Sequence, residues 1–141
     1  MSRSFPHLET QRLIVFLPAP ELAAGLVEYY GRNREHLAPW EPRRSAEFWT
    51  VDWWMRQLEY NQREFREDRG ARMVIAGREA PERVVGVANL SNTVRGSFQA
   101  CYLGYSIDQE LEGKGLMREA LEAVLEFAFE ELGLHRVMAN Y

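Results

Sequence analysis

A lysine between two glycines, in the stretch LEGKGLM at positions 111–117, is the part of this sequence best suited to binding an anion. Gly113 and Gly115 have no Cβ, so the backbone there can approach a phosphate closely. An apolar-periodic segment follows, and the first N–H groups of a helix lack intrahelical partners and lie at the positive end of its dipole. The stretch therefore indicates either a phosphate-binding loop at a helix N-terminus or a structural turn. It has neither the Walker nor the dinucleotide-binding spacing.

The histidines and the single cysteine argue against a metal centre. His7, His36 and His135 are far apart in the sequence and share no ligand spacing. Cys101 stands alone, which excludes an internal disulfide and a cysteine-rich zinc site. We expect no metal, and we expect Cys101 to be a small core residue.

Charge and hydropathy exclude two further classes of partner. The net charge is −4 at pH 7, and the arginines are dispersed, mostly beside acids, so we expect no direct binding of nucleic acid. No run approaches the ~18 apolar residues of a membrane span, and the start has no apolar stretch of signal-peptide length. With one cysteine, these features predict a cytoplasmic protein with no membrane partner.

Apolar periodicity predicts one mixed sheet with helices. The expected strands span 12–18, 71–77, 83–92, 98–107 and 135–141, and the expected helices span 20–33, 46–67 and 116–132. The order β-α-α-β-β-β-α-β contains no repeat or linker. It predicts a single domain over residues 1–141, of the α/β or α+β class.

The last expected element is an apolar strand, which is an unusual way for a sheet to end because its outer edge would offer unpaired N–H and C=O groups. We therefore expect that the C-terminal part of the fold, after the fifth strand, is absent. We also expect the edge beside Val137–Tyr141 to pair with another chain, which predicts a homodimer.

Five segments, in one colinear order, resemble a known family. LETQRLIV, NREHLAPWEP, GVANLSNTVRGSFQACYLGYSI, GKGLMREAL and HRVMANY look closely like the RimJ/RimL-type ribosomal-protein-alanine N-acetyltransferases of the GNAT superfamily. The resemblance implies the GNAT fold, with a mixed, mostly antiparallel central sheet and helices on both faces.

The resemblance implies acetyl-CoA as the cosubstrate. The family's pyrophosphate loop, Q/R-x-x-G-x-G/A, corresponds here to residues 112–117. Two positions depart from it: Glu112 is an acid where the family usually has Gln or Arg, and Met117 replaces a small residue. Binding through main-chain N–H groups survives both changes. The cofactor-binding residues implied in this loop are Gly113, Lys114, Gly115, Leu116 and Met117.

The resemblance also implies that the strand 98–107 holds the pantetheine arm through its main chain. The residues implied are Leu103, Gly104, Tyr105 and Ser106, and a glycine within a strand suits close backbone approach. Core packing is the alternative for Tyr102 and Tyr105. Strand alternation favours it for Tyr105, which shares a face with Leu103.

Acetyl transfer to an amine requires a neutral amine, hydrogen-bond donors for the tetrahedral oxyanion and a proton for the leaving thiolate. Glu41, between two prolines, is a candidate to receive the substrate ammonium; a loop or capping role is the alternative. Asn140 and Tyr141 are the other catalytic candidates, because related enzymes place polar groups at the end of the last strand.

The function implied is acetylation of a protein N-terminus, that of a ribosomal protein beginning with alanine. Two alternatives stay open. One is acetylation of a small-molecule amine, and the other is a catalytically inactive CoA-binding or interaction module.

Overall fold

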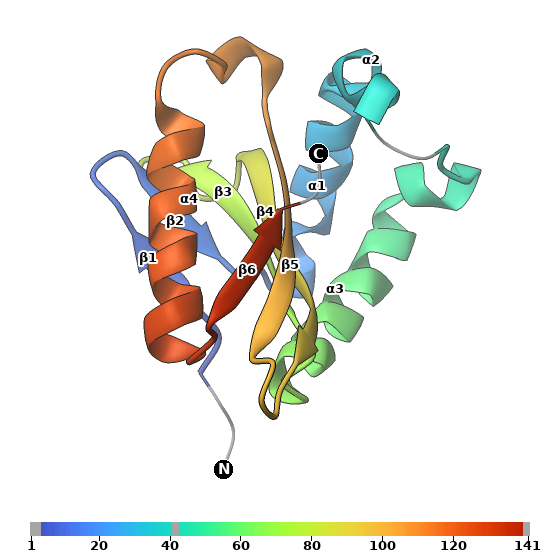
Figure 1. Ribbon diagram of the computed structural model, residues 1–141. Coiled ribbons are helices and arrows are strands. Elements are labelled where there is room, and N and C mark those ends of the chain that lie inside the picture. Colours follow the sequence, from blue (N-terminus) through green and yellow to red (C-terminus); the bar gives the residue numbers. More distant parts are fainter. Residues whose placement is uncertain (1–3, 41–42, 140–141) are drawn as a thin grey trace.

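One six-stranded sheet organises the chain, whose computed structural model describes residues 4–40 and 43–139. The strands lie in the sheet in their sequence order (Figure 1). All neighbours are antiparallel except the last pair, which is parallel. The strands are β1 (His7–Glu9), β2 (Leu13–Phe16), β3 (Ala71–Gly77), β4 (Val84–Val94), β5 (Ala100–Ile107) and β6 (Arg136–Ala139).

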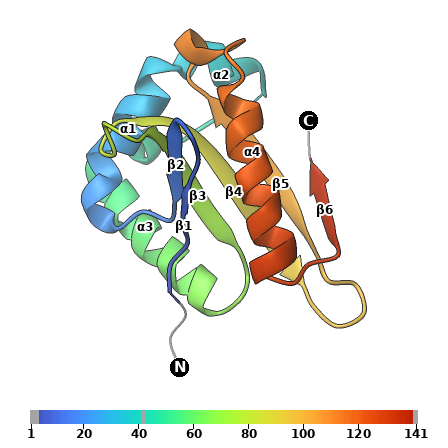
Figure 2. The same ribbon diagram turned by 90° about the vertical axis from the view of Figure 1, so that its left-hand side faces the viewer.

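Helices cover both faces of this sheet. The α-helices are α1 (Ala23–Arg32), α2 (Arg34–Leu37), α3 (Val51–Arg66) and α4 (Leu116–Glu126). Helices α1 and α3 lie on one face and α4 on the other, as two views at right angles show (Figures 1 and 2). Short 3-10 turns span Pro20–Leu22, Ala38–Trp40, Ala46–Trp49 and Gln109–Leu111, and a π-helical turn spans Phe127–Glu131. This architecture confirms the fold class expected from the sequence.

Two apolar clusters hold these layers together, one on each face of the sheet. On the α4 face, Ala120 and Val124 pack with strand residues such as Leu103. On the other face, Tyr30 stacks on Trp54, with ring centroids 5.5 Å apart and planes inclined by 14°. Strand alternation explains the division, since successive side chains point to opposite faces.

The structure differs from the expected elements mainly at their ends. The strand at 71–77 is as predicted, whereas β1 was missed because its three residues are too short to show a period. The expected strand start at 98 is wrong: Gln99 has φ +47°, outside the extended region, and β5 begins at Ala100. Thr50 caps α3 by accepting a hydrogen bond from the Trp53 N–H, which separates that helix from the turn before it.

Candidate active site

Strand β5 is paired with β6 along only half of its length. The register runs from Ala100–Arg136 to Leu103–Ala139, while β5 continues to Ile107. The N–H of Asp108 donates to the carbonyl of Val85 on β4 (2.7 Å), and the side to which main-chain groups point alternates along a strand. The N–H and C=O groups of Tyr105 and Ile107 therefore face away from β4. No strand in the described part of the chain pairs with them there.

The loop before α4 turns at two glycines in the left-handed region. Gly113 has φ +79° and Gly115 has φ +77°, and Gly115 is the N-cap of the helix. The first helical bond runs from the Glu119 N–H to the Gly115 carbonyl (3.1 Å). Among the residues that the structure describes, the N–H groups of Gly113, Lys114 and Gly115 donate to no protein acceptor. The glycines thus set a row of unused donors at the positive end of α4.

Residues of the turn between β1 and β2 contact this loop and the first turn of α4. Glu119, in the first turn of α4, accepts from the Arg12 main-chain N–H (2.8 Å), from Arg12 Nε (2.8 Å) and from the Thr10 hydroxyl. Arg12 also donates to the Lys114 carbonyl (3.3 Å). The Thr10 hydrogen bond, with the bonds and charge of Arg12, lowers the pKa of Glu119 below its ordinary value. Sequence patterns did not predict this contact among Thr10, Arg12 and Glu119, because it joins residues far apart in the chain.

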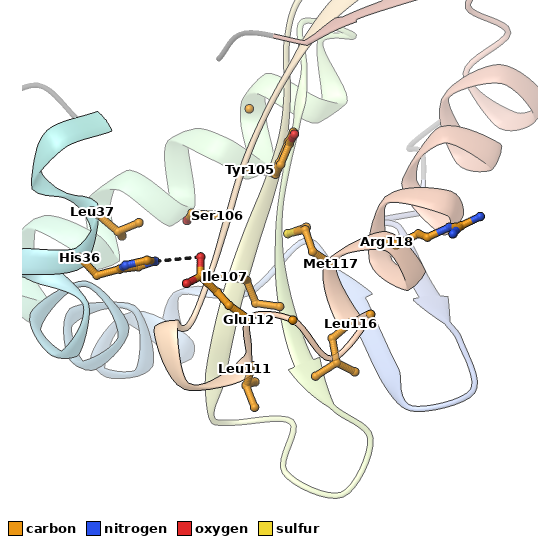
Figure 3. Close-up of a pocket in the computed structure, with 13 residues that line it drawn as sticks. His36, Leu37, Tyr105, Ser106, Ile107, Leu111, Glu112, Leu116, Met117 and Arg118 are labelled. Carbon is orange, nitrogen blue, oxygen red and sulfur yellow. Dashed lines mark ion pairs between the residues drawn. The ribbon is translucent and has the colours of Figure 1, made fainter.

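A pocket of about 540 Å³ joins the free edge of β5 to the glycine loop (Figure 3). Its walls are mostly backbone and apolar side chains, and α2 closes the side opposite α4. The lining residues are His36, Leu37, Gly104, Tyr105, Ser106, Ile107, Leu111, Glu112, Gly113, Gly115, Leu116, Met117 and Arg118.

His36 and Glu112 face one another across this pocket, from α2 and from the loop (Figure 3). His36 Nε2 lies 3.2 Å from Glu112 Oε2, so the contact is an ion pair when the imidazole is protonated. The acid that replaces the family's usual Gln or Arg therefore has a partner. Sequence reasoning considered His36 only as a metal ligand, because the contact spans a long stretch of chain.

Most residues expected to bind the cofactor lie together in this pocket. Two do not: Leu103 is buried on the α4 face, and Lys114 is exposed and outside the lining. The residues expected from the sequence that line the pocket are Gly104, Tyr105, Ser106, Gly113, Gly115, Leu116 and Met117.

The two tyrosines of β5 are not core residues. Tyr102 is 37% exposed and Tyr105 is 39% exposed, so the core packing favoured for Tyr105 is wrong. Tyr105 is exposed because it lies beyond Leu103, where the pairing of β5 with β6 stops. Ser106 points to the other face, where its hydroxyl hydrogen-bonds that of Tyr29 at 2.7 Å.

The three catalytic candidates, Glu41, Asn140 and Tyr141, lie outside the described residues. Cys101, by contrast, is fully buried, and burial raises the pKa of its thiol to about 11. The thiol is protonated at neutral pH and has no thiolate to act as a nucleophile. It is a core residue, as expected.

The described residues contain no cluster of three or more His, Cys, Asp or Glu side chains that could hold a metal ion. Likewise, no helix within 4–40 and 43–139 has the length and apolar composition needed to cross a membrane.

The strand edge, the pocket and the glycine loop suit an elongated ligand with a diphosphate at one end. A Cβ built on Gly113 would meet no atom within 4 Å, so the outer side of the loop has room for a phosphate. An extended amide-containing arm matches the main-chain groups of β5. The fold and the site thus define an acetyl-CoA-dependent acyltransferase. The acetyltransferase (GNAT) domain family matches residues 12–141, and the chain belongs to that family as an N-acetyltransferase.

Individual relatives agree with this assignment. The chain is 43% identical over 135 residues to the [ribosomal protein uS5]-alanine N-acetyltransferase of Escherichia coli, across 96% of this chain and 69% of the relative. The crystal structure of ribosomal-protein-S5-alanine acetyltransferase from Vibrio fischeri superposes with a TM-score of 0.89 at 34% identity, covering 95% of this chain and 73% of that one. Mycobacterium smegmatis RimJ, in complex with CoA-disulfide, shares the fold with a TM-score of 0.83 at 23% identity, covering 96% and 66%. The RimJ-type resemblance seen in the sequence is confirmed.

Proposed function

We propose that this enzyme transfers the acetyl group of acetyl-CoA to the N-terminal amine of a protein that begins with alanine, and that its acceptor is ribosomal protein uS5. The observation that carries the proposal is the 43% identity to the Escherichia coli enzyme named for this activity, which extends over 96% of the chain. The similarity to the Vibrio fischeri enzyme of the same name supports it.

The proposed diphosphate site uses the unpaired N–H groups of Gly113, Lys114 and Gly115, with those of Leu116 and Met117 in the first turn of α4. Main-chain donors at a helix N-terminus are suited to a diphosphate because the helix dipole favours negative charge there. The ammonium group of Lys114 is exposed, so in this proposal it adds a screened charge contact rather than a buried one.

The proposed pantetheine site is the free edge of β5. Because the main-chain groups of Tyr105 and Ile107 face the side that β6 leaves unpaired, an extended arm adds there like a further strand. Gly104 and Ser106 then contact it through their exposed atoms in the pocket wall. We propose that the N–H of Tyr105 polarises the thioester carbonyl and so stabilises the oxyanion of the tetrahedral intermediate.

Chemistry beyond cofactor binding is assigned to three residues. Glu41 follows the turn Ala38–Trp40 in the sequence and is proposed to receive the substrate ammonium. Asn140 and Tyr141 follow β6, the strand beside the cofactor edge, and are proposed to face the reacting groups. The homodimer and the cytoplasmic location expected from the sequence stay predictions.

The experiment is a thiol-release assay with acetyl-CoA and three kinds of acceptor. These are a peptide with the first ten residues of uS5 after its initiator methionine, the same peptide already acetylated at its N-terminus, and small amines such as spermidine and free alanine. We expect release only with the free peptide, and mass spectrometry should place one acetyl group on its first residue. Faster thiol release with a small amine than with the peptide would show that the acceptor is a small molecule. No release with any amine would show that the protein is a catalytically inactive CoA-binding module.

A further inference from the structure

A second pocket, of about 330 Å³, adjoins the acetyl-CoA pocket. Leu37 lines both, so the two are separated by little more than one side chain of α2. The other residues around the second pocket are Tyr30, Arg34, Ala38, Arg43, Arg44, Phe48 and Trp49. It therefore combines three guanidinium groups with an aromatic floor.

Aromatic rings fix two of these guanidinium groups. The Cζ atom of Arg34 lies 4.4 Å from the centroid of the Trp49 ring, and that of Arg44 lies 4.5 Å from the Phe48 ring. A guanidinium stacked on a ring face keeps its N–H groups directed outward in its own plane, in the fork that matches a carboxylate. The stacking therefore orients donors in advance of a ligand.

Unpaired arginines gather in this pocket. Most other arginines are matched by nearby acids, as in the pairs made by Arg12, Arg32, Arg56, Arg69, Arg72, Arg78, Arg83, Arg95 and Arg118. Arg63, Arg66 and Arg136 make no such pair in the described residues, but they line none of the pockets described above. In the part of the chain that the structure describes, Arg34 and Arg43 pair with no carboxylate. The protein as a whole carries a net charge of −4. Unmatched positive charge at one concave site indicates an anion supplied from outside.

The position of the pocket indicates which molecule brings the anion. A third cavity, of about 310 Å³, shares Tyr30, Arg44 and Phe48 with the second pocket. It runs between α3 and β4, where Asn61 and Asn89 line it. The hollows thus continue from the acetyl-CoA pocket along the α1 and α3 face, which gives an extended polypeptide a path away from the acetyl group.

We infer that Arg34 and Arg43 form a subsite for a carboxylate side chain of the acceptor polypeptide, close behind its acetylated N-terminus. The subsite makes the enzyme select acceptors with an acidic residue at one fixed position. This inference rests on the proposed acetylation of a protein N-terminus. A carboxylate accepts two parallel N–H bonds from a guanidinium, which gives both affinity and register.

The test is a set of alanine-starting decapeptides with one glutamate stepped through positions 2 to 6, compared with a peptide that has glutamine at all of them. At one position the glutamate should lower the peptide KM about tenfold, the equivalent of one charge-assisted hydrogen bond. The kcat and the KM for acetyl-CoA should stay unchanged. The preference should weaken as salt is raised, because the site is open to solvent.

Variants assign the effect to the pocket. Arg34→Gln and Arg43→Gln should each remove most of the preference for glutamate, whereas Arg34→Lys should keep part of it, since charge remains but the fork is lost. Arg56→Gln is the matched control: Arg56 is an exposed arginine of α3, paired with Asp52 and outside every pocket described above. Thermal melts should show that all four variants fold.

Equal KM values for all peptides, or an undiminished glutamate preference in both glutamine variants, would overturn the inference. If no alanine peptide is acetylated, the proposed function fails, and calorimetry with the same peptides decides the inference separately. The inference is supported if one glutamate peptide binds more tightly than the glutamine peptide and if this difference is lost in Arg34→Gln and Arg43→Gln. Equal affinities for all peptides would overturn it. Binding of a twelve-nucleotide single-stranded RNA that depends on both arginines, without any peptide dependence, would assign the site to phosphates instead.

Discussion

Arg12 Nε lies 2.8 Å from Oε1 of Glu119 and ties the turn between β1 and β2 to the first turn of α4. Residues 107 positions apart thereby fix the orientation of the glycine loop. Glu119 does this without occupying the loop's own donors, because its bonds come from Thr10 and Arg12. The loop's N–H groups stay available for phosphate oxygens.

Glu119→Gln should destabilise the protein by about 1 kcal/mol near neutral pH, the net worth of a partly exposed charge-assisted bond. The pKa of Glu119 is lowered in the folded state, so its contribution is fully present above the unfolded pKa of about 4.3 and is lost as pH falls through the folded pKa. Urea unfolding at a series of pH values should show that the unfolding free energies of the two proteins become equal in acid. A difference in unfolding free energy that stays constant down to pH 2 would contradict this account.

Gly115→Val should raise the KM for acetyl-CoA about tenfold or more, because a β-branched residue at φ +77° is strained by about 1–2 kcal/mol or else rotates the loop's N–H groups away. The measurement is the steady-state KM together with the unfolding free energy. Gly31→Ala is the control, since Gly31 lies within α1 and a Cβ there would meet no atom within 4 Å. That change should leave KM alone and stabilise the helix by up to about 1 kcal/mol.

The sequence was informative where structure depends on neighbours along the chain. The apolar run at 71–77 predicted β3, and the helical period with the glycines at 113 and 115 predicted α4 and its loop. Contacts between segments far apart in the sequence could not be predicted from these local patterns. The pairing of Glu119 with Arg12 and of Glu112 with His36 exists only because the fold brings together elements far apart in the sequence.

Glu112→Gln should tighten CoA binding about two- to fivefold, because the variant removes a negative charge from the wall of the pocket that we assign to the diphosphate. The gain should shrink at high salt, since the Glu112 side chain is 53% exposed. Calorimetric titration with CoA at two ionic strengths measures both effects. Glu67→Gln is the control: Glu67, at the end of α3, is equally exposed (52%) and pairs with Arg69 outside the pocket, so this change should leave CoA binding unaltered. Weaker CoA binding by Glu112→Gln would mean that the His36 contact organises the loop more than the charge opposes the ligand.

The single cysteine gives a direct probe of the folded core. Burial raises the pKa of the Cys101 thiol to about 11, so in the native protein at pH 8 the thiol should resist iodoacetamide, and it should react at once in concentrated urea. A raised pKa also means that the folded state holds the proton more tightly. Its contribution to stability is therefore fully present below the unfolded pKa of about 8.5 and is lost as pH rises toward 11.

Cys101→Ala tests whether Cys101 contributes only to packing or also takes part in acetyl transfer. The smaller side chain should cost about 1 kcal/mol of stability through the space it leaves among Leu103 and its neighbours, and the stability difference from the native protein should narrow between pH 8.5 and pH 11. The kcat should be unchanged, because a thiol that stays protonated carries no acetyl group. Rapid alkylation of the native protein together with loss of turnover in Cys101→Ala would instead require an acetyl-cysteine intermediate on β5.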